Sequence, residues 1–77
     1  MAERTYTFRI KLKEALEEAN MTQSELAELT GLRRATISEI AQNSRTVMNK
    51  SHLGKIMDAL DLTDMNDILE LVIEETL

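Results

Sequence analysis

The 77-residue chain carries a net charge of −5, contains no cysteine or proline, and is rich in Ala, Leu, Glu, Met and Ile, which favour helices. The lack of cysteine excludes disulfides and thiolate metal sites, and eight charges among the first twenty residues exclude a signal peptide or membrane span there. We therefore expect one small cytoplasmic domain, residues 1–77, whose limited core would benefit from a partner subunit.

The N-terminal segment shows two patterns in succession. Thr5 to Arg9 alternates and is rich in β-favouring residues, which predicts a short strand or an extended arm. Within it, Tyr6 is either an anchor for a partner chain or a partly exposed packing residue. A first helix is predicted over about Phe8 to Ala19, with Asn20 as its terminator. Its expected core stripe consists of apolar residues at helical spacing: Phe8, Leu12, Ala15, Leu16 and Ala19.

A second helix is predicted to begin after Thr22. The Thr22 side chain can accept from the backbone N–H of Glu25, and the Glu25 side chain can reach back to Thr22, which together make a capping box. The helix should end near Leu29, because Gly31 can take the left-handed conformation that closes a helix. A third helix then begins within about three residues of that glycine.

Two short helices joined by one glycine turn must cross steeply, so a small residue is needed where they touch. Ala27 meets that need. Ile37 and Ile40 give the third helix an inward face, and Leu32 fills the turn between the two helices. This spacing is typical of a DNA-binding helix-turn-helix, which we place at about residues 22–42.

The segment resembles the lambda-repressor/Cro-like (XRE) helix-turn-helix family. With the helices before and after it, the resemblance covers most of the chain, and it implies a repressor-like domain that binds double-stranded DNA. Eight residues carry the resemblance: Gln23, Leu26, Ala27, Gly31, Thr36, Ile37, Ser38 and Ile40.

The resemblance also implies roles for the third helix. In this family its first turn, and the residue about five positions further on, approach base edges in the major groove. Arg34 could bind guanine in bidentate fashion, Ala35 could touch a thymine methyl, and Glu39 could accept from cytosine, with Ser38 nearby. Contacts to phosphate would fall to six polar or basic residues: Gln23, Arg33, Thr36, Asn43, Arg45 and Lys50.

Three positions depart from the family pattern. Arg33 stands where the family often has Ser or Thr, so the third helix lacks a side-chain acceptor at its start. Ala41 stands where the family often has Glu, and Glu39 where it often has a basic or amide residue. Glu39 therefore specifies cytosine, lowers non-specific binding, or is simply a solvated helix residue.

Asn49 can cap a fourth helix that runs to about Leu60. Gly54 lowers the helix propensity there by about 1 kcal/mol relative to Ala. This glycine either lies where something packs closely or is exposed and merely tolerated. The inward face of the helix is predicted to consist of Leu53, Ile56, Met57 and Leu60.

Thr63 can cap a fifth helix, from Asp64 to about Glu75. Its apolar residues spread over more than one face, which predicts a second surface that covers it. We therefore expect an all-α, compact five-helix domain with a possible short N-terminal arm, which forms a homodimer through the fifth helix or, failing that, through the arm. The proposed dimer seam consists of Leu69, Val72, Ile73 and Leu77.

The charge distribution supports DNA as the partner, although the net charge does not. Residues 33–55 hold five basic residues against one acidic residue, whereas residues 56–77 hold seven acidic residues and no basic ones. The basic part can face phosphate while the acidic part faces away, although an ordinary solvated surface would show the same pattern.

Enzyme functions are poorly supported by the sequence. His52 is the single histidine and has no cysteine near it, and there is no Gly-rich phosphate loop, so we expect no catalytic residues, no metal and no cofactor. The sequence predicts a sequence-specific transcriptional regulator that binds double-stranded DNA, and specifically a repressor. The alternative is an antitoxin or another protein-interaction module on the same scaffold, whose acidic C-terminal helix covers a basic partner.

Overall fold

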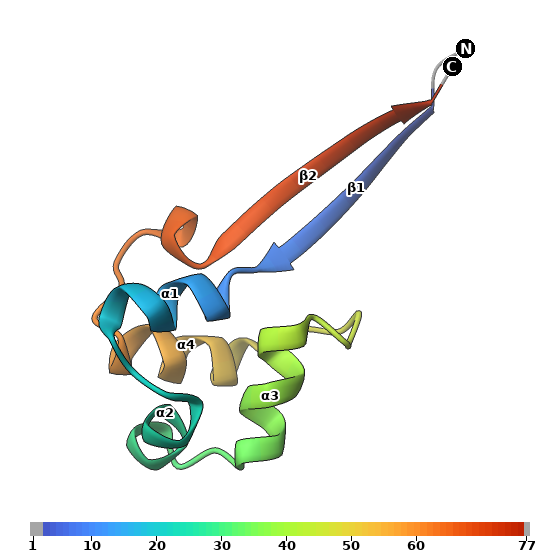
Figure 1. The fold of residues 1–77 in the computed structure, drawn as a ribbon. Coiled ribbons are helices and arrows are strands. Elements are labelled where there is room, and N and C mark those ends of the chain that lie inside the picture. Colours follow the sequence, from blue (N-terminus) through green and yellow to red (C-terminus); the bar gives the residue numbers. More distant parts are fainter. Residues whose placement is uncertain (1–2, 77) are drawn as a thin grey trace.

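The computed structural model describes residues 3–76, in which four helices form a globular part and two strands form a ribbon that projects from it (Figure 1). The two strands come from opposite ends of the chain, so the ribbon brings the N-terminal and C-terminal segments together. In chain order the elements are β1 (Glu3–Ile10), α1 (Leu12–Ala19), α2 (Gln23–Thr30), α3 (Arg34–Gln42), α4 (Lys50–Ala59), the 3-10 helix η1 (Met65–Asp67) and β2 (Leu69–Thr76).

The predicted caps of the second and fourth helices are confirmed. The Thr22 side chain accepts from the Glu25 backbone N–H at 3.1 Å, and the Glu25 carboxylate accepts from the Thr22 backbone N–H at 3.1 Å. Asn49 Oδ1 accepts from the backbone N–H groups of the first turn of α4. Each cap satisfies donors that have no partner inside the helix, so both helix starts are fixed by local chemistry.

The core lies between the helices and is closed from the ribbon side by the residue that precedes β2. Ile68 is fully buried there, and its carbonyl accepts from the Lys11 backbone N–H at 2.7 Å. The buried cluster is entirely apolar and consists of Leu12, Ala15, Leu16, Leu26, Ile37, Ala41, Leu53, Ile56 and Ile68. Ile37 was predicted to face inward, and Ile40 packs against the same cluster while remaining partly exposed.

The predicted five-helix, all-α fold is wrong, because the segment expected to form the fifth helix is mostly a strand. Strand β2 pairs antiparallel with β1 along its whole length, from Ile10 opposite Leu69 to Glu3 opposite Thr76. The β-branched pair Val72 and Ile73 favours a strand, and β1 supplies the backbone partners that a strand needs. The fold is therefore a helical domain with a two-stranded antiparallel ribbon.

The start of the first helix was also predicted too early. Helix α1 begins at Leu12, and Phe8 lies in β1 with most of its side chain exposed, not in the core. The strand or arm expected at Thr5 to Arg9 is a strand, and it extends by two residues at the N-terminal end to Glu3.

Arg9 anchors the base of the ribbon to the globular part. Its guanidinium pairs with Glu14 of α1 and with Glu70 of β2, where Arg9 Nε and Glu70 Oε1 are 3.0 Å apart. The hydrogen bond from Arg9 lowers the pKa of the Glu14 carboxyl and raises the pKa of Arg9 itself. This three-residue contact joins both strands and the first helix at one point.

The two glycines should respond in opposite directions to replacement by alanine. Gly31 closes α2 at φ +74°, whereas Gly54 lies inside α4. Apart from the adjoining backbone, nothing in the described residues lies within 4 Å of the site of an added Cβ at either position. The prediction of close packing at Gly54 is therefore wrong, and the exposed alternative is correct.

Gly31→Ala should lower the free energy of unfolding by about 1 kcal/mol, because of backbone strain. Gly54→Ala should raise it by about 0.5–1 kcal/mol. Urea denaturation measures both, and changes of the same sign would contradict this account.

Candidate nucleic-acid interface

Helices α2 and α3 are joined by the turn at Gly31, and α2 and the start of α3 lie at the end of the globular part farthest from the ribbon tip (Figure 1). Leu26 of α2 and Ile37 of α3 are both fully buried, so the core holds the two helices against each other. Leu32, in the turn, is partly buried against the same core. The opposite side of α3 is left open to solvent.

The outward side of α3 carries the residues predicted to approach bases. Arg34 and Ala35 are exposed, and Ser38 and Glu39 are partly buried. The helix starts after Arg33, whose φ of −70° and ψ of 145° are extended, and no side chain in residues 3–76 caps that start. The missing acceptor was predicted from the sequence. It leaves backbone N–H groups at the start of α3 available to an anion.

Arg34 links the start of α3 to the first turn of α2. Its Nη1 donates to Ser24 Oγ at 2.9 Å, and its Nε donates to Gln23 Oε1 at 3.4 Å. These contacts use two of the five guanidinium donors and hold the group between the two helices. The structure thus brings together Gln23, predicted to contact phosphate, and Arg34, predicted to contact a base.

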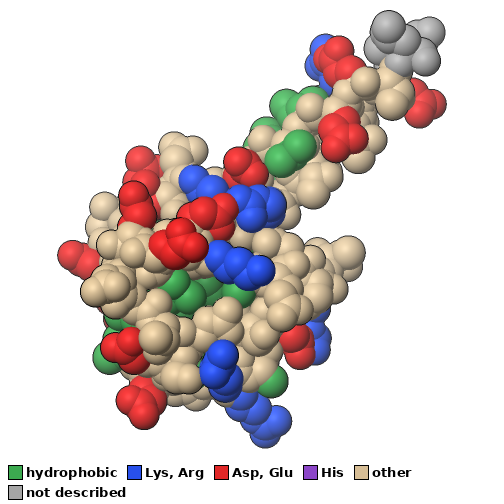
Figure 2. Space-filling model, in the orientation of Figure 1, with side chains coloured by type: hydrophobic (Ala, Val, Ile, Leu, Met, Phe, Trp, Pro, Cys, Tyr) green, Lys and Arg blue, Asp and Glu red, His purple; other side chains and the backbone are tan. Residues whose placement is uncertain are grey.

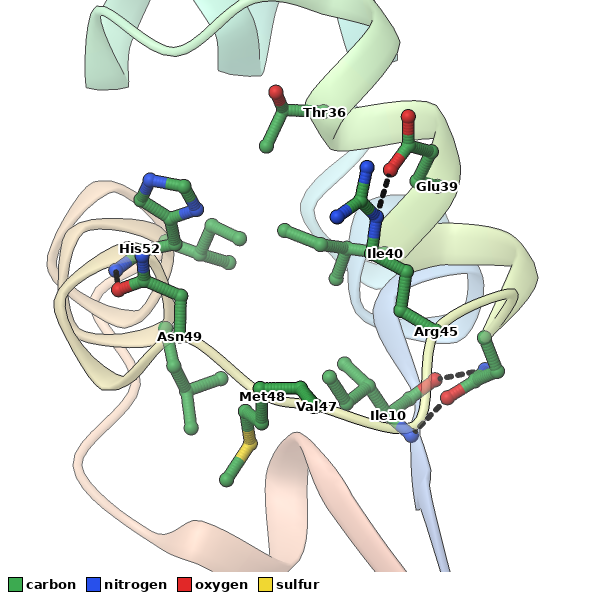
Figure 3. A pocket seen from close by; sticks show the side chains of 12 residues that line it. Ile10, Thr36, Glu39, Ile40, Arg45, Val47, Met48, Asn49 and His52 are labelled. Atoms are coloured by element: carbon green, nitrogen blue, oxygen red, sulfur yellow. Dashed lines mark hydrogen bonds and ion pairs between the residues drawn. The ribbon is translucent and has the colours of Figure 1, made fainter.

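Glu39 pairs with Arg45, which lies in the loop after α3 (Figure 3). Because the guanidinium offsets the carboxylate charge, Glu39 repels a nearby phosphate less than an isolated acid would. Periodicity could not show this pair, since Arg45 lies beyond the end of the helix. On the neighbouring part of α3, Gln42 Nε2 donates to Ser38 Oγ at 3.1 Å.

A cleft of about 300 Å³ separates α3 from the first turn of α4 (Figure 3). Ile10, Ile40, Leu53 and other apolar side chains line its interior. Its polar lining includes Thr36 on α3 and Asn49 at the start of α4. The side chain of Asn49 caps α4, and Lys50 follows as the first residue of that helix. The cleft therefore lies between two segments that were predicted to contact phosphate.

Asn43 was predicted to contact phosphate, but in the structure its side chain holds the end of β1. Its Oδ1 accepts from the Ile10 backbone N–H at 2.7 Å, and its Nδ2 donates to the Ile10 carbonyl at 2.9 Å. Asn43 also closes α3 in the left-handed conformation, at φ 54°. Sequence reasoning missed this role because Ile10 lies 33 positions away.

The predicted dimer seam was placed on a helix, but its described residues, Leu69, Val72 and Ile73, lie in the strand β2. Leu69 and Ile73 are four apart in β2 and share a face, whereas Val72 points to the opposite face. Leu77 lies outside the described residues. A seam at helical spacing therefore cannot form here.

Charged side chains are unevenly placed on the surface. Figure 2 shows Lys and Arg side chains at the lower edge of the globular part, where α3 begins, and again near the base of the ribbon, whereas many Asp and Glu side chains lie along the left side of the globular part. Within residues 3–76, no cluster of His, Asp and Glu could hold a metal ion. No helix in this part of the chain is long and apolar enough to cross a membrane.

Comparison with known proteins identifies a family and a similar solved structure. A family model described as the Cro/C1-type HTH DNA-binding domain matches residues 11–74, which include all four helices and most of β2. No protein of curated function matches the chain. The chain is similar to the crystal structure of the transcriptional regulator VanUg (Form II), with a TM-score of 0.66 and 27% sequence identity over 87% of this chain and 89% of that one.

Proposed function

Since the chain belongs to the family of Cro/C1-type HTH DNA-binding domains, we propose that it is a sequence-specific transcriptional regulator of the XRE type, and not an enzyme. It would bind double-stranded DNA with α3 in the major groove. The observation that carries this proposal is the exposed start of α3, where Arg34 lies beside Gln23 and Ser24 of α2. The similarity to a structure described as a transcriptional regulator supports it.

Base contacts are proposed for the outward side of α3. Arg34 can bind guanine O6 and N7, Ala35 can touch a thymine methyl, and Ser38 can serve as donor or acceptor. Glu39 can accept from a cytosine amino group only if it turns away from Arg45. A contact between Glu39 and a base would therefore have to compete with the ion pair between Glu39 and Arg45.

Phosphate contacts are proposed for residues on both sides of α3. Asn43 is left out of this set, because both ends of its side-chain amide are engaged by Ile10. With a net charge of −5 on the chain, binding away from the preferred site should be weak. The remaining proposed contacts are Gln23, Arg33, Thr36, Arg45 and Lys50.

We further propose that the protein acts as a homodimer and represses by occupying its site. A dimer would place one α3 on each half-site of a palindrome, with half-site centres about one helical turn apart. Such a regulator works in the compartment that holds the DNA, which we take to be the cytoplasm. A protein bound over a promoter in this way blocks transcription without any further domain.

Selection of bound duplexes from a random pool tests the proposal. We expect enrichment of a palindrome whose half-sites are centred about 10 base pairs apart, or a multiple of that spacing. A transcription reporter placed behind the enriched site should then fall in output when the protein is present. Recovery of duplexes with no common sequence would contradict specific binding, and the protein-interaction alternative would become the better explanation.

A further inference from the structure

The two faces of the ribbon differ sharply in polarity. Tyr6 lies opposite Ile73 and Phe8 lies opposite Leu71, and alternate pairs in an antiparallel ribbon share a face. The exposed fractions of these residues are 53% for Tyr6, 70% for Phe8, 51% for Leu71 and 50% for Ile73. The opposite face holds the pairs between them: Thr5 with Glu74, Thr7 with Val72, and Arg9 with Glu70. Hydrophobic side chains on the ribbon are visible in Figure 2.

This apolar face, defined by Tyr6, Phe8, Leu71 and Ile73, is not covered by the globular part. The ribbon projects from the helices, and the molecule measures 48 Å along its long axis against 22 Å and 19 Å across (Figure 1). A two-stranded ribbon alone is at best marginally stable in water, so exposure on both faces is unfavourable. Four such side chains expose on the order of 400 Å² of apolar surface, which is the size of the largest patch on a typical monomer, and such a patch is often a binding surface.

We infer that the apolar face of the ribbon binds the same face of a second copy of this chain. A two-fold axis brings one patch onto an identical patch, so an apolar surface of this shape is complementary to itself. This inference identifies the surface through which the homodimer of the proposed function would form, and it therefore rests on that proposed function.

The charges around the patch favour a second copy over a charged partner. At the ribbon tip, Arg4 lies on the apolar face and pairs with Glu75, with Arg4 Nε and Glu75 Oε1 2.8 Å apart. Within residues 3–76, this face therefore carries no net charge, and two copies can meet there without the repulsion expected elsewhere on an acidic chain. A basic partner would find no unpaired acid on it.

The position of the ribbon leaves the DNA-binding side free. The ribbon leaves the globular part beside α1, whereas α2 and the start of α3 lie at the far end (Figure 1). Two copies joined by their ribbons can therefore both present α3. Asn43, which bonds to Ile10 at the base of β1, connects the end of α3 to the same ribbon.

The size of the patch sets the expected stability of the dimer. Association of two copies through this face would bury about 800 Å² of apolar surface, which is less than the roughly 1,200–2,000 Å² buried in stable specific interfaces. The free protein should therefore dimerise in a concentration-dependent way, and a palindromic duplex should strengthen the dimer by holding both copies. Loss of the dimer should lower affinity for the full palindrome by about 10²-fold, because the second half-site no longer adds avidity.

Two neighbouring lysine substitutions test the face. Phe8→Lys places a charge on the apolar face, and Thr7→Lys places the same charge one residue away on the opposite face. Sedimentation equilibrium over a range of concentrations should show a dimer for the parent and for Thr7→Lys, and a monomer for Phe8→Lys. A parent that stays monomeric at all concentrations, or a Phe8→Lys protein that dimerises like the parent, would overturn the inference.

Cysteine variants test the dimer contact without adding a charge, so they show whether the loss of the dimer in Phe8→Lys comes from misfolding. The chain contains no cysteine, so Phe8→Cys and Thr7→Cys each provide a single thiol. A short bismaleimide should join two copies of Phe8→Cys efficiently, and two copies of Thr7→Cys poorly. Equal cross-linking of the two variants would place the contact elsewhere and would also overturn the inference.

Binding to a duplex with one half-site separates this inference from the proposed function. If Phe8→Lys is a monomer and binds the half-site as the parent does, both stand. If the parent dimerises but binds no duplex specifically, the ribbon contact stands and DNA regulation falls. If the parent binds the palindrome but shows no dimer with or without DNA, the ribbon contact falls and DNA regulation stands.

Discussion

Replacing Asn43 with Ala should lower the free energy of unfolding by about 2–5 kcal/mol, a large share of the stability of so small a domain. The substitution removes two hydrogen bonds to the Ile10 backbone, each worth about 0.5–1.5 kcal/mol. It also forces Ala to adopt φ 54°, which costs about 1–2 kcal/mol. Urea denaturation followed by circular dichroism measures the change.

Asn43→Gly separates the two contributions. Glycine adopts positive φ freely, so this variant loses only the hydrogen bonds and should be destabilised by about 1–3 kcal/mol. Asn43→Asp keeps the acceptor for the Ile10 N–H but places a carboxylate oxygen against the Ile10 carbonyl, so it should also lose stability. Parent-like stability of Asn43→Ala would show that the contact between α3 and β1 contributes nothing.

The features that the sequence predicted correctly are those that depend on near neighbours. The capping box of Thr22 and Glu25, the glycine closure at Gly31 and the Asn49 cap each involve residues within about one helical turn. Such signals need no knowledge of the rest of the fold. They were enough to place the helix-turn-helix and hence the candidate DNA-binding side.

The ribbon was missed because a strand needs a partner that the local sequence does not contain. The apolar residues of β2 suit one side of a helix nearly as well as one face of a strand, and only the pairing with β1 decides between them. Phe8 was misassigned for the same reason, since its spacing from Leu12 is also helical. The residues of the predicted dimer seam were then chosen at the spacing of a helix, whereas the segment is a strand.

Within the site, the sequence predicted which side chains point outward but not what they contact. The 100° step along α3 predicted Ala35, Ser38 and Glu39 as outward, with Arg34 on the flank of the helix. The contacts of Arg34 with Ser24 and of Glu39 with Arg45 depend on how α2 and the loop after α3 lie against α3. That arrangement is set by the buried core and is not encoded in spacing.

Substitution of Arg34 should weaken binding and change specificity, whereas substitution of Lys50 should only weaken binding. Arg34→Ala should cost about 1–3 kcal/mol on the preferred duplex and relax discrimination at one base pair per half-site. Lys50→Ala should weaken binding to all sequences alike and reduce the salt slope by about one for each phosphate that the lysine neutralises in the parent. Titrations on preferred and scrambled duplexes at several salt concentrations measure both effects.

Arg34→Lys is the control that separates charge from geometry. Lysine keeps the positive charge but lacks the planar fork that binds guanine O6 and N7 together. It also cannot hold Gln23 and Ser24 in the same arrangement, because the two Arg34 contacts come from different nitrogens of one guanidinium. Arg34→Lys should therefore keep the salt slope of the parent while losing discrimination at the same base pair as Arg34→Ala. If Arg34→Lys instead discriminates as the parent does, Arg34 contacts phosphate, and the base contacts of α3 must lie at Ala35, Ser38 or Glu39.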